Sequence, residues 1–245
     1  DQNIRLVNSS GYLIPFNILE EDSNTAITVT PQIINNIPTV IDTRDIYCEN
    51  IIVKQYINTW DTDAGWLPLG QDIYGEAVDD KSGYSVSLSA DGTIVAIGAY
   101  RNEGVNGYRS GHVRIHKYNE TTSTWLQLGQ DIDGEAEYDY SGYSVSLSAN
   151  GKIVAIGAIY NNNGSVNGSN SGHVRIYELD GSTWIQIGED IDGETSWRQS
   201  GESVSLSANG TRVAIGAPLG GGNVKIYELD GSTWVQIGED IDGDV

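Results

Sequence analysis

The feature that most constrains the fold is an internal repeat. Three copies begin at Ser82-Gly83, Ser141-Gly142 and Ser200-Gly201, and successive starts are 59 residues apart. Tryptophans mark one position of the repeat, at Trp66, Trp125, Trp184 and Trp234, with intervals of 59, 59 and 50 residues. The last interval is shorter because a single loop loses nine residues. The segments SVSLSA, VAIGA and IGEDIDG recur almost unchanged, so accidental similarity within a plain β-sandwich explains the pattern poorly.

Each copy predicts four short strands. In the second copy they cover residues 143–148, 153–158, 173–179 and 183–188. Val145 and Leu147 alternate with serines, which is the period of a half-buried strand. The dipeptides Asn150-Gly151 and Asp180-Gly181 favour tight hairpins because they tolerate positive φ. Four-stranded antiparallel units at this period are typical of propeller blades, so the predicted fold is all-β, a β-propeller or an open segment of one.

The repeat also predicts how the chain is divided. We expect an N-terminal arm at 1–22, a degenerate blade or attachment segment at 23–73, and blades at 74–132, 133–191 and 192–245, the last with the start of a further linker. The segment 23–73 lacks the hairpin glycines and is interrupted by Pro31 and Pro38. The chain begins at Asp1, contains no methionine and stops in a linker, so we expect it to be processed and part of a longer array.

The composition limits the partners. The formal net charge is −21, with 34 acidic and 13 basic residues, and such a surface repels nucleic acid and anionic membranes. No apolar run approaches the roughly 18 residues of a membrane-spanning helix. Cys48 is the single cysteine, so an intrachain disulfide is impossible.

The motifs SVSLS, VAIGA and DIDGE resemble the divergent subgroup of the FG-GAP type of β-propeller repeat. That family is known from integrin alpha subunits and from secreted or surface proteins of bacteria, algae and their large viruses. Its Gly-Ala-Pro motif is complete only at Gly216-Ala217-Pro218, and its Phe-Gly opening is Ser-Gly in this chain. The resemblance implies a propeller used for adhesion or as a structural module, with no shared catalytic residues. We also expect an extracellular or virion-surface location and no cofactor.

Integrin repeats hold Ca²⁺ in an acidic loop between their first two strands, but that role does not carry over. The corresponding connection in the first copy is only Ala90-Asp91-Gly92, too short to supply six to eight oxygen ligands. A second acidic cluster, Asp131, Asp133, Glu135 and Asp139, has the spacing of a loose Ca²⁺ loop. Two interpretations stay open for it: carboxylates that accept backbone N–H groups and face water, or a single cation site.

The sequence predicts no metal site from histidines and no enzyme. His112 and His116 lie four residues apart on a predicted strand, about 13 Å, too far to share a zinc ion. Motifs for an activated nucleophile, a phosphate-binding loop or paired cysteines are missing from the sequence. A propeller hydrolase is therefore only a remote alternative.

The predicted function is a non-enzymatic structural or adhesive module within a longer protein or assembly. Its expected partners are further blades or other protein subunits. The alternative is a lectin that stacks sugars on loop aromatics, with Trp197, Tyr138 and Tyr140 as the candidate contacts and Trp197 placed outside the repeat pattern. Five sequons are candidates for N-glycosylation of a secreted eukaryotic protein: Asn8, Asn119, Asn163, Asn167 and Asn209.

Overall fold

The computed structural model describes residues 68–162 and 168–243 in full, together with four short strands nearer the N-terminus. The chain forms two units, Asp1–Leu67 and Pro68–Val245. In the first unit, β1 (Leu6–Val7) pairs with β2 (Leu13–Ile14) and β3 (Phe16–Glu21) pairs with β4 (Ile27–Pro31), both antiparallel. The predicted arm and degenerate blade fall mainly on this unit and stay predictions, because most of their residues and Cys48 lie outside the described residues.

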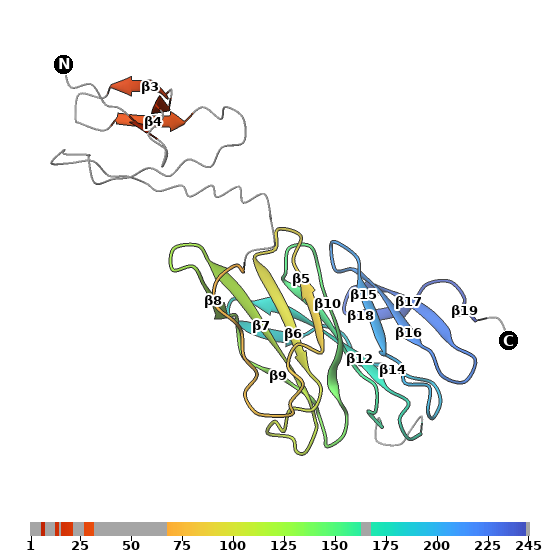
Figure 1. Cartoon of the computed structure of the whole chain (residues 1–245). Coiled ribbons are helices and arrows are strands. Elements are labelled where there is room, and N and C mark those ends of the chain that lie inside the picture. Colours follow the sequence, from red (N-terminus) through yellow and green to blue (C-terminus); the bar gives the residue numbers. More distant parts are fainter. Residues whose placement is uncertain are drawn as a thin grey trace. The chain divides into compact units, whose positions relative to one another are not determined.

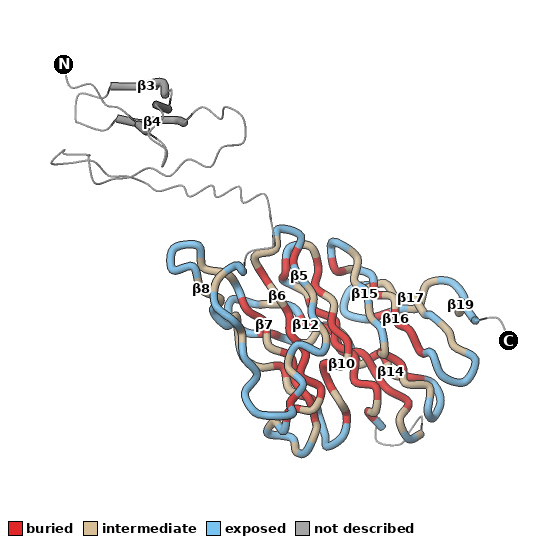
Figure 2. Tube along the Cα trace, in the orientation of Figure 1, coloured by how far each residue is buried: buried red, intermediate tan, exposed pale blue. Residues whose placement is uncertain are grey.

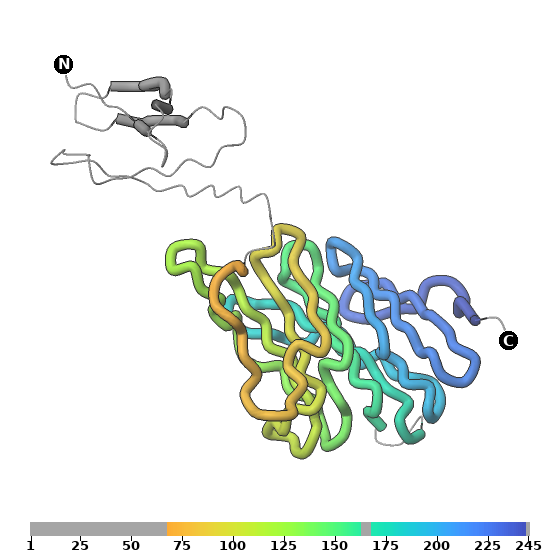
Figure 3. The backbone as a smooth tube through the Cα atoms, in the orientation of Figure 1, coloured from red at the N-terminus to blue at the C-terminus, as the bar shows by residue number. Residues whose placement is uncertain are grey.

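The second unit consists of three antiparallel five-stranded sheets that follow one another along the chain (Figures 1 and 3). The first blade contains β5 (Ser85–Leu88), β6 (Ile94–Ala99), β7 (His112–Asn119), β8 (Thr124–Gln127) and β9 (Ile132–Asp133). The second contains β10 (Ser141–Leu147), β11 (Ile153–Ala158), β12 (His173–Asp180), β13 (Thr183–Gln186) and β14 (Ile191–Asp192). The third contains β15 (Ser203–Leu206), β16 (Arg212–Ala217), β17 (Asn223–Asp230), β18 (Thr233–Gln236) and β19 (Ile241–Asp242).

Four strands of each sheet form the predicted meander, so the all-β fold of four-stranded antiparallel blades is confirmed. The fifth strand was not predicted. This fifth strand contains two residues of the DIDG segment. It pairs with the third strand, beyond the stretch of that strand that pairs with the fourth strand. The described residues contain no helix long and apolar enough to cross a membrane.

The first hairpin of each blade is closed by its own side chains. In the first blade, Ser89 Oγ donates to Asp91 Oδ1 at 2.6 Å, and the Thr93 backbone N–H donates to the same oxygen at 3.0 Å. These hydrogen bonds favour the charged carboxylate and lower the pKa of Asp91 to about 2. Asn150 and Asn209 accept the equivalent bonds in the other two blades. The hairpin oxygens are thus engaged within their own turn.

The first strand of the second blade, β10, has both faces in contact with other blades. In β10, Val145 and Leu147 belong to the core cluster shared with the first blade, which contains Val113 and Ile115. The alternating serines point the other way, and Ser144 Oγ donates to the Gly201 carbonyl of the third blade at 2.6 Å. The half-buried strand predicted here is therefore wrong for β10, because the serine face is the contact with the next blade.

Backbone atoms come unusually close between neighbouring blades. Gly157 on β11 packs so tightly against Gly201 that a Cβ on Gly157 would overlap the Gly201 carbonyl oxygen. Gly98 and Gly142 repeat this contact between the first two blades. Since a real Cβ cannot occupy that space, glycine is required at the position by the approach of the next blade.

The hairpin tips are also linked from blade to blade by backbone hydrogen bonds. The Ala90 N–H donates to the Ala149 carbonyl at 2.8 Å, and the Ala149 N–H donates to the Ala208 carbonyl at 2.8 Å. Each bond joins the same repeat position in two neighbouring blades. The blades are therefore held in register by main-chain groups as well as by apolar packing.

The repeated tryptophans occupy equivalent sites on the fourth strands, as predicted: Trp125 on β8, Trp184 on β13 and Trp234 on β18. The Trp184 indole is 3% exposed, and its Nε1–H donates to the Leu128 carbonyl of the first blade at 2.8 Å. Gln130 pairs with both backbone groups of Trp184, at 2.9 and 3.0 Å. The ring thus fastens the outer strand of one blade to the preceding blade.

The two ends of the three-blade stack are exposed. In the first blade Val86 and Leu88 are 63% and 59% exposed, whereas their repeat equivalents Val145 and Leu147 are 9% and 7% exposed. At the other end, the strands β17 and β19 are intermediate or exposed where β12 and β14 are largely buried (Figure 2). Each end presents a face that is covered wherever a neighbouring blade is present.

Candidate functional site

The polar site that recurs in the described blades is a Glu–His–Asp cluster at the side of each of the first two sheets. In the second blade it consists of Glu135, His173 and Asp190. His173 begins β12, and Asp190 lies just before β14, which pairs with β12. His173 Nδ1 lies 3.5 Å from Asp190 Oδ2 and 4.0 Å from Glu135 Oε2. The imidazole is buried, and both carboxylates are partly exposed to solvent.

The first blade repeats the cluster with Glu76, His112 and Asp131. His112 Nδ1 lies 3.8 Å from Glu76 Oε2 and 3.8 Å from Asp131 Oδ2. Here Glu76 Oε2 also accepts a hydrogen bond from Asn102 Nδ2 at 3.3 Å. The two clusters therefore have the same geometry, but the Glu oxygen is shared in the first blade.

An arginine fixes the glutamate of each cluster. Arg175 Nη1 lies 3.2 Å from Glu135 Oε1, and its Nη2 donates to the Asp133 carbonyl at 2.9 Å. Arg114 makes the corresponding contacts with Glu76, at 3.6 Å, and with the Tyr74 carbonyl, at 2.6 Å. The guanidinium thereby ties the linker before a blade to the third strand of that blade.

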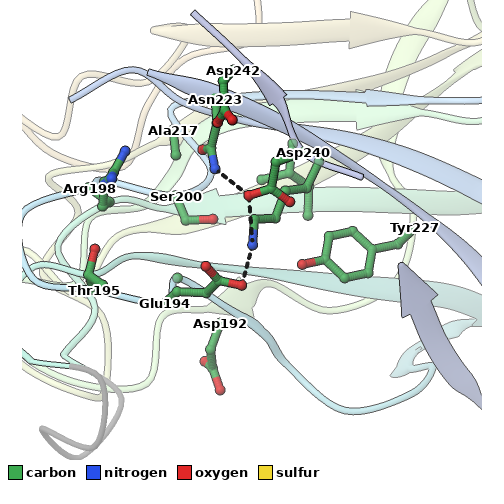
Figure 4. A pocket seen from close by; sticks show the side chains of 13 residues that line it. Asp192, Glu194, Thr195, Arg198, Ser200, Ala217, Asn223, Tyr227, Asp240 and Asp242 are labelled. Carbon is green, nitrogen blue, oxygen red and sulfur yellow. Dashed lines mark hydrogen bonds and ion pairs between the residues drawn. The ribbon is translucent and has the colours of Figure 1, made fainter. Parts of the chain in front are cut away.

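The third blade has a different version of the cluster, in a pocket of about 130 Å³ (Figure 4). Asn223 replaces the histidine and donates from Nδ2 to Asp240 Oδ2 at 2.9 Å. Lys225 replaces the arginine, and its ammonium contacts both Glu194 and Asp240, the latter at 3.4 Å. A side-chain cation therefore lies between the two carboxylates in this blade.

The electrostatics of the clusters follow from burial and from the paired carboxylates. Burial lowers the pKa of His112, although the neighbouring Asp131 and Glu76 act in the opposite direction. The imidazole of His173 lowers the pKa of Asp190. An imidazole nitrogen beside two carboxylate oxygens is a donor set for cations.

The acidic segment predicted as one cluster is divided by the structure. Asp131 belongs to the cluster of the first blade and Glu135 to that of the second. Asp139 is buried, where it accepts hydrogen bonds from Ala136 N at 2.9 Å and Asn161 Nδ2 at 3.1 Å. Burial raises the pKa of Asp139. These side chains do not act as one calcium-type loop.

His112 and His116 both lie on β7. Of these two histidines, only His112 belongs to a Glu–His–Asp cluster. The cluster around His112 was missed because its three members come from three separate segments of one copy. A signal was present, since Glu135 and Asp190 follow Glu76 and Asp131 by 59 residues each.

The candidate sugar-binding aromatics lie in two different environments. Tyr138 is half exposed and forms an edge-to-face pair with Tyr108 at 5.4 Å. Tyr140 is partly buried and packs against Tyr100 and Tyr160 at 5.2 and 4.9 Å. The structure therefore does not bring the three candidates into one cluster of equally exposed rings.

Trp197 is an exposed ring that belongs to the repeat after all. Its φ of 65° matches the 66° of Tyr138, which stands 59 residues earlier. The two residues also make equivalent backbone hydrogen bonds. The Trp197 N–H donates to the Ser169 carbonyl, and the Tyr138 N–H donates to the Tyr108 carbonyl. The expectation that Trp197 lies outside the repeat pattern is wrong. Among the sequons, Asn119 is the last residue of β7 and is partly buried, Asn209 lies in a turn and is exposed, and Asn8, Asn163 and Asn167 lie outside the described residues.

Comparison with known proteins agrees with the repeat. Residues 132–177 match the model of the FG-GAP repeat, so this segment is similar to a repeat of that family, and the antiparallel four-stranded sheets are consistent with propeller blades. The match covers the start of β9 to the middle of β12. No curated protein sequence matches the chain.

Similar solved structures share low identity. Two are described as 6-phosphogluconolactonases, from Bacteroides uniformis (16% identity, TM-score 0.43, 63% of this chain) and Bacteroides fragilis (16%, 0.45, 65%). A third is Saccharomyces cerevisiae Sqt1, at 14% identity and TM-score 0.43 over 69% of this chain. The alignments cover 39%, 38% and 37% of those chains, so this chain spans well under half of their length.

Proposed function

We propose that the protein is a non-enzymatic structural or adhesive module of an extracellular or virion surface. Its blades pack against further blades, supplied by a longer chain or by another subunit. FG-GAP repeats are typical of extracellular proteins, which supports this location. The acidic surface supports the same setting, because it keeps an exposed repeat array soluble.

The observation that carries the proposal is the match between the two exposed ends of the stack. Val86 and Leu88 present the face that Val145 and Leu147 bury against the first blade. At the other end, Ser203 and Ser205 are exposed, whereas Ser144 donates to a following blade. One end offers the apolar half of the contact between blades and the other end offers the serine half. A head-to-tail contact therefore joins complementary faces.

The test is the assembly state of residues 1–245 in solution. We expect self-association and binding of a dye that reports apolar surface. Val86→Lys should reduce both, because a lysine on this face disfavours its burial. Val78→Lys is the matched control, since Val78 is a fully solvent-exposed loop valine. A compact monomer that binds no dye would contradict the proposal and indicate that the chain covers its own exposed face.

A second candidate function, sugar binding, is favoured by the displayed rings. Tyr138 and Trp197 occupy the same position of successive blades with strained left-handed backbones, and both rings are exposed. If the protein is a lectin, Trp197→Ala should weaken binding on a glycan array by roughly tenfold or more. The control is Tyr74→Ala, which removes an exposed ring from another loop. Equal binding by both variants and the native protein would exclude Trp197 as a sugar contact.

A further inference from the structure

We propose that Glu135, His173 and Asp190 bind a divalent first-row transition-metal ion, and that Glu76, His112 and Asp131 form a second, weaker site of the same kind. The inference concerns ligand binding at the side of the blades and goes beyond the proposed packing function. It also revises the expectation from sequence that histidines bind no metal in this chain.

The spacing of the donor atoms fits one small ion. In the second blade the imidazole nitrogen lies 3.5 and 4.0 Å from the two carboxylate oxygens. Ligands at 2.0–2.1 Å from a tetrahedral Zn²⁺ are about 3.3 Å apart. The three donor atoms lie within 4.8 Å of one another, so rotations that move the side-chain tips by about 1 Å would bring them to this spacing, and solvent would supply the fourth ligand.

Neighbouring side chains already orient the donors. Gln186 Nε2 donates to Asp190 Oδ1 at 2.7 Å, which leaves Asp190 Oδ2 directed at the imidazole. Arg175 holds Glu135 Oε1 and leaves Oε2 on the same side. Such contacts around the ligands are typical of metal sites because they fix the ligand orientation.

The histidine itself has an unused nitrogen. His173 is buried, and among the described residues its Nδ1 has no hydrogen-bond partner. A buried polar atom without a partner is costly, and an ion between the three side chains would satisfy it. The same nitrogen lies near both carboxylates, so the atom that lacks a partner is one of the three proposed ligand atoms.

The third blade shows what the position requires. There the histidine is replaced by Asn223, and Lys225 places its ammonium between Glu194 and Asp240. The loss of the imidazole is thus accompanied by a built-in cation at the same place. In the first two blades the arginine contacts only the glutamate of the two carboxylates, and the aspartate oxygen lies 3.8 or 3.5 Å from the histidine Nδ1.

The ligand chemistry selects the class of ion. Imidazole nitrogen with two carboxylates suits Zn²⁺, Fe²⁺, Ni²⁺ or Cu²⁺, whereas Ca²⁺ needs six to eight oxygen ligands. Glu135 and Asp190 are partly exposed, so an ion can enter from solvent. In the first blade Asn102 shares the Glu76 oxygen, which is why we expect weaker binding there.

The experiment uses the full metal-free chain and Zn²⁺ as the probe, titrated by calorimetry with a low-affinity chelator as competitor. We expect one tight and one weaker site. His173→Asn should remove the tight site, with a loss in affinity of at least about 100-fold, and His112→Asn should remove the other. Asparagine is the native residue at this position of the third blade, so both variants are expected to fold. Asp240→Asn is the matched control in the third blade and should leave Zn²⁺ binding unchanged.

A second readout identifies the ligand. Co²⁺ bound to the native chain should give visible d–d absorption of a low-coordinate site, and His173→Asn should lose most of it. Asp190→Asn provides an independent variant if His173→Asn is unfolded by circular dichroism. The proposal is overturned if Zn²⁺ does not bind to the native chain. It is also overturned if Zn²⁺ still binds to the double variant His112→Asn/His173→Asn and Ca²⁺ competes equally well. That result would indicate nonspecific attraction of cations to an acidic surface.

Discussion

Replacing Gly157 by alanine is expected to lower the free energy of unfolding by about 3 kcal/mol or more. The added methyl group would overlap the Gly201 carbonyl oxygen, so the second and third blades must move apart or one of them must distort. The displacement would also weaken the hydrogen bond from Ser144 Oγ to the same carbonyl. Urea unfolding followed by circular dichroism and tryptophan fluorescence measures the change.

Gly216→Ala is the control for this prediction. Gly216 has the same place on β16, and a Cβ there would meet the Ser203 side chain, as a Cβ on Gly157 would meet Ser144. Only Gly157 also faces the backbone of a following blade. We expect Gly216→Ala to cost roughly 1 kcal/mol or less, because a serine side chain can rotate away. Equal losses for the two variants would mean that the serine contact, rather than the contact between blades, decides the effect.

The second large effect is expected at Trp184. Truncation to alanine should cost about 3–5 kcal/mol, because the buried ring fills the space between β13 and the preceding blade. Gly129 lies against this ring, with a Cβ position 2.6 Å from Trp184 Cδ1, and has no side chain with which to fill the cavity. Thermal and urea unfolding of the full chain measure the loss.

Two variants separate the contributions of the Trp184 ring. Trp184→Phe keeps most of the apolar volume and loses the hydrogen bond to the Leu128 carbonyl, so about 1–2 kcal/mol should be lost. Trp197→Ala, which removes a ring that is 61% exposed, should change stability by less than about 0.5 kcal/mol. If Trp184→Ala were no worse than Trp197→Ala, the indole would not be part of the core.

The strands and hairpins were predictable because their signals are local. The alternation around Val145 and the Asn150-Gly151 turn depend on residues within a few positions, and the four main strands of each blade agree with them. The two-residue strands such as β14 were not predictable, since two residues show no period. The role of Ser144 was hidden for another reason, because its partner Gly201 is 57 residues away.

The candidate site was predictable only in part. The sequence shows that Asp131 and Asp190 are equivalent, but it does not show that the pairing of β12 with β14 brings Asp190 beside His173. The carboxylates of segment 131–139 are close in sequence, which suggested a single loop. In the structure Asp131 and Glu135 belong to clusters of different blades. The repeat thus identifies equivalent residues, and the register of the sheet decides which of them meet.

The hydrogen bonds between hairpin tips have a consequence for how such a protein evolves. The Ala90, Ala149 and Ala208 bonds use only main-chain atoms, and the tight glycine contacts likewise involve the backbone of the next blade. A duplicated gene segment encoding one blade would therefore carry both halves of the joint with it, without compensating side-chain changes. Loops such as the short one after Ala217 can then diverge freely, while the number of blades changes by whole units.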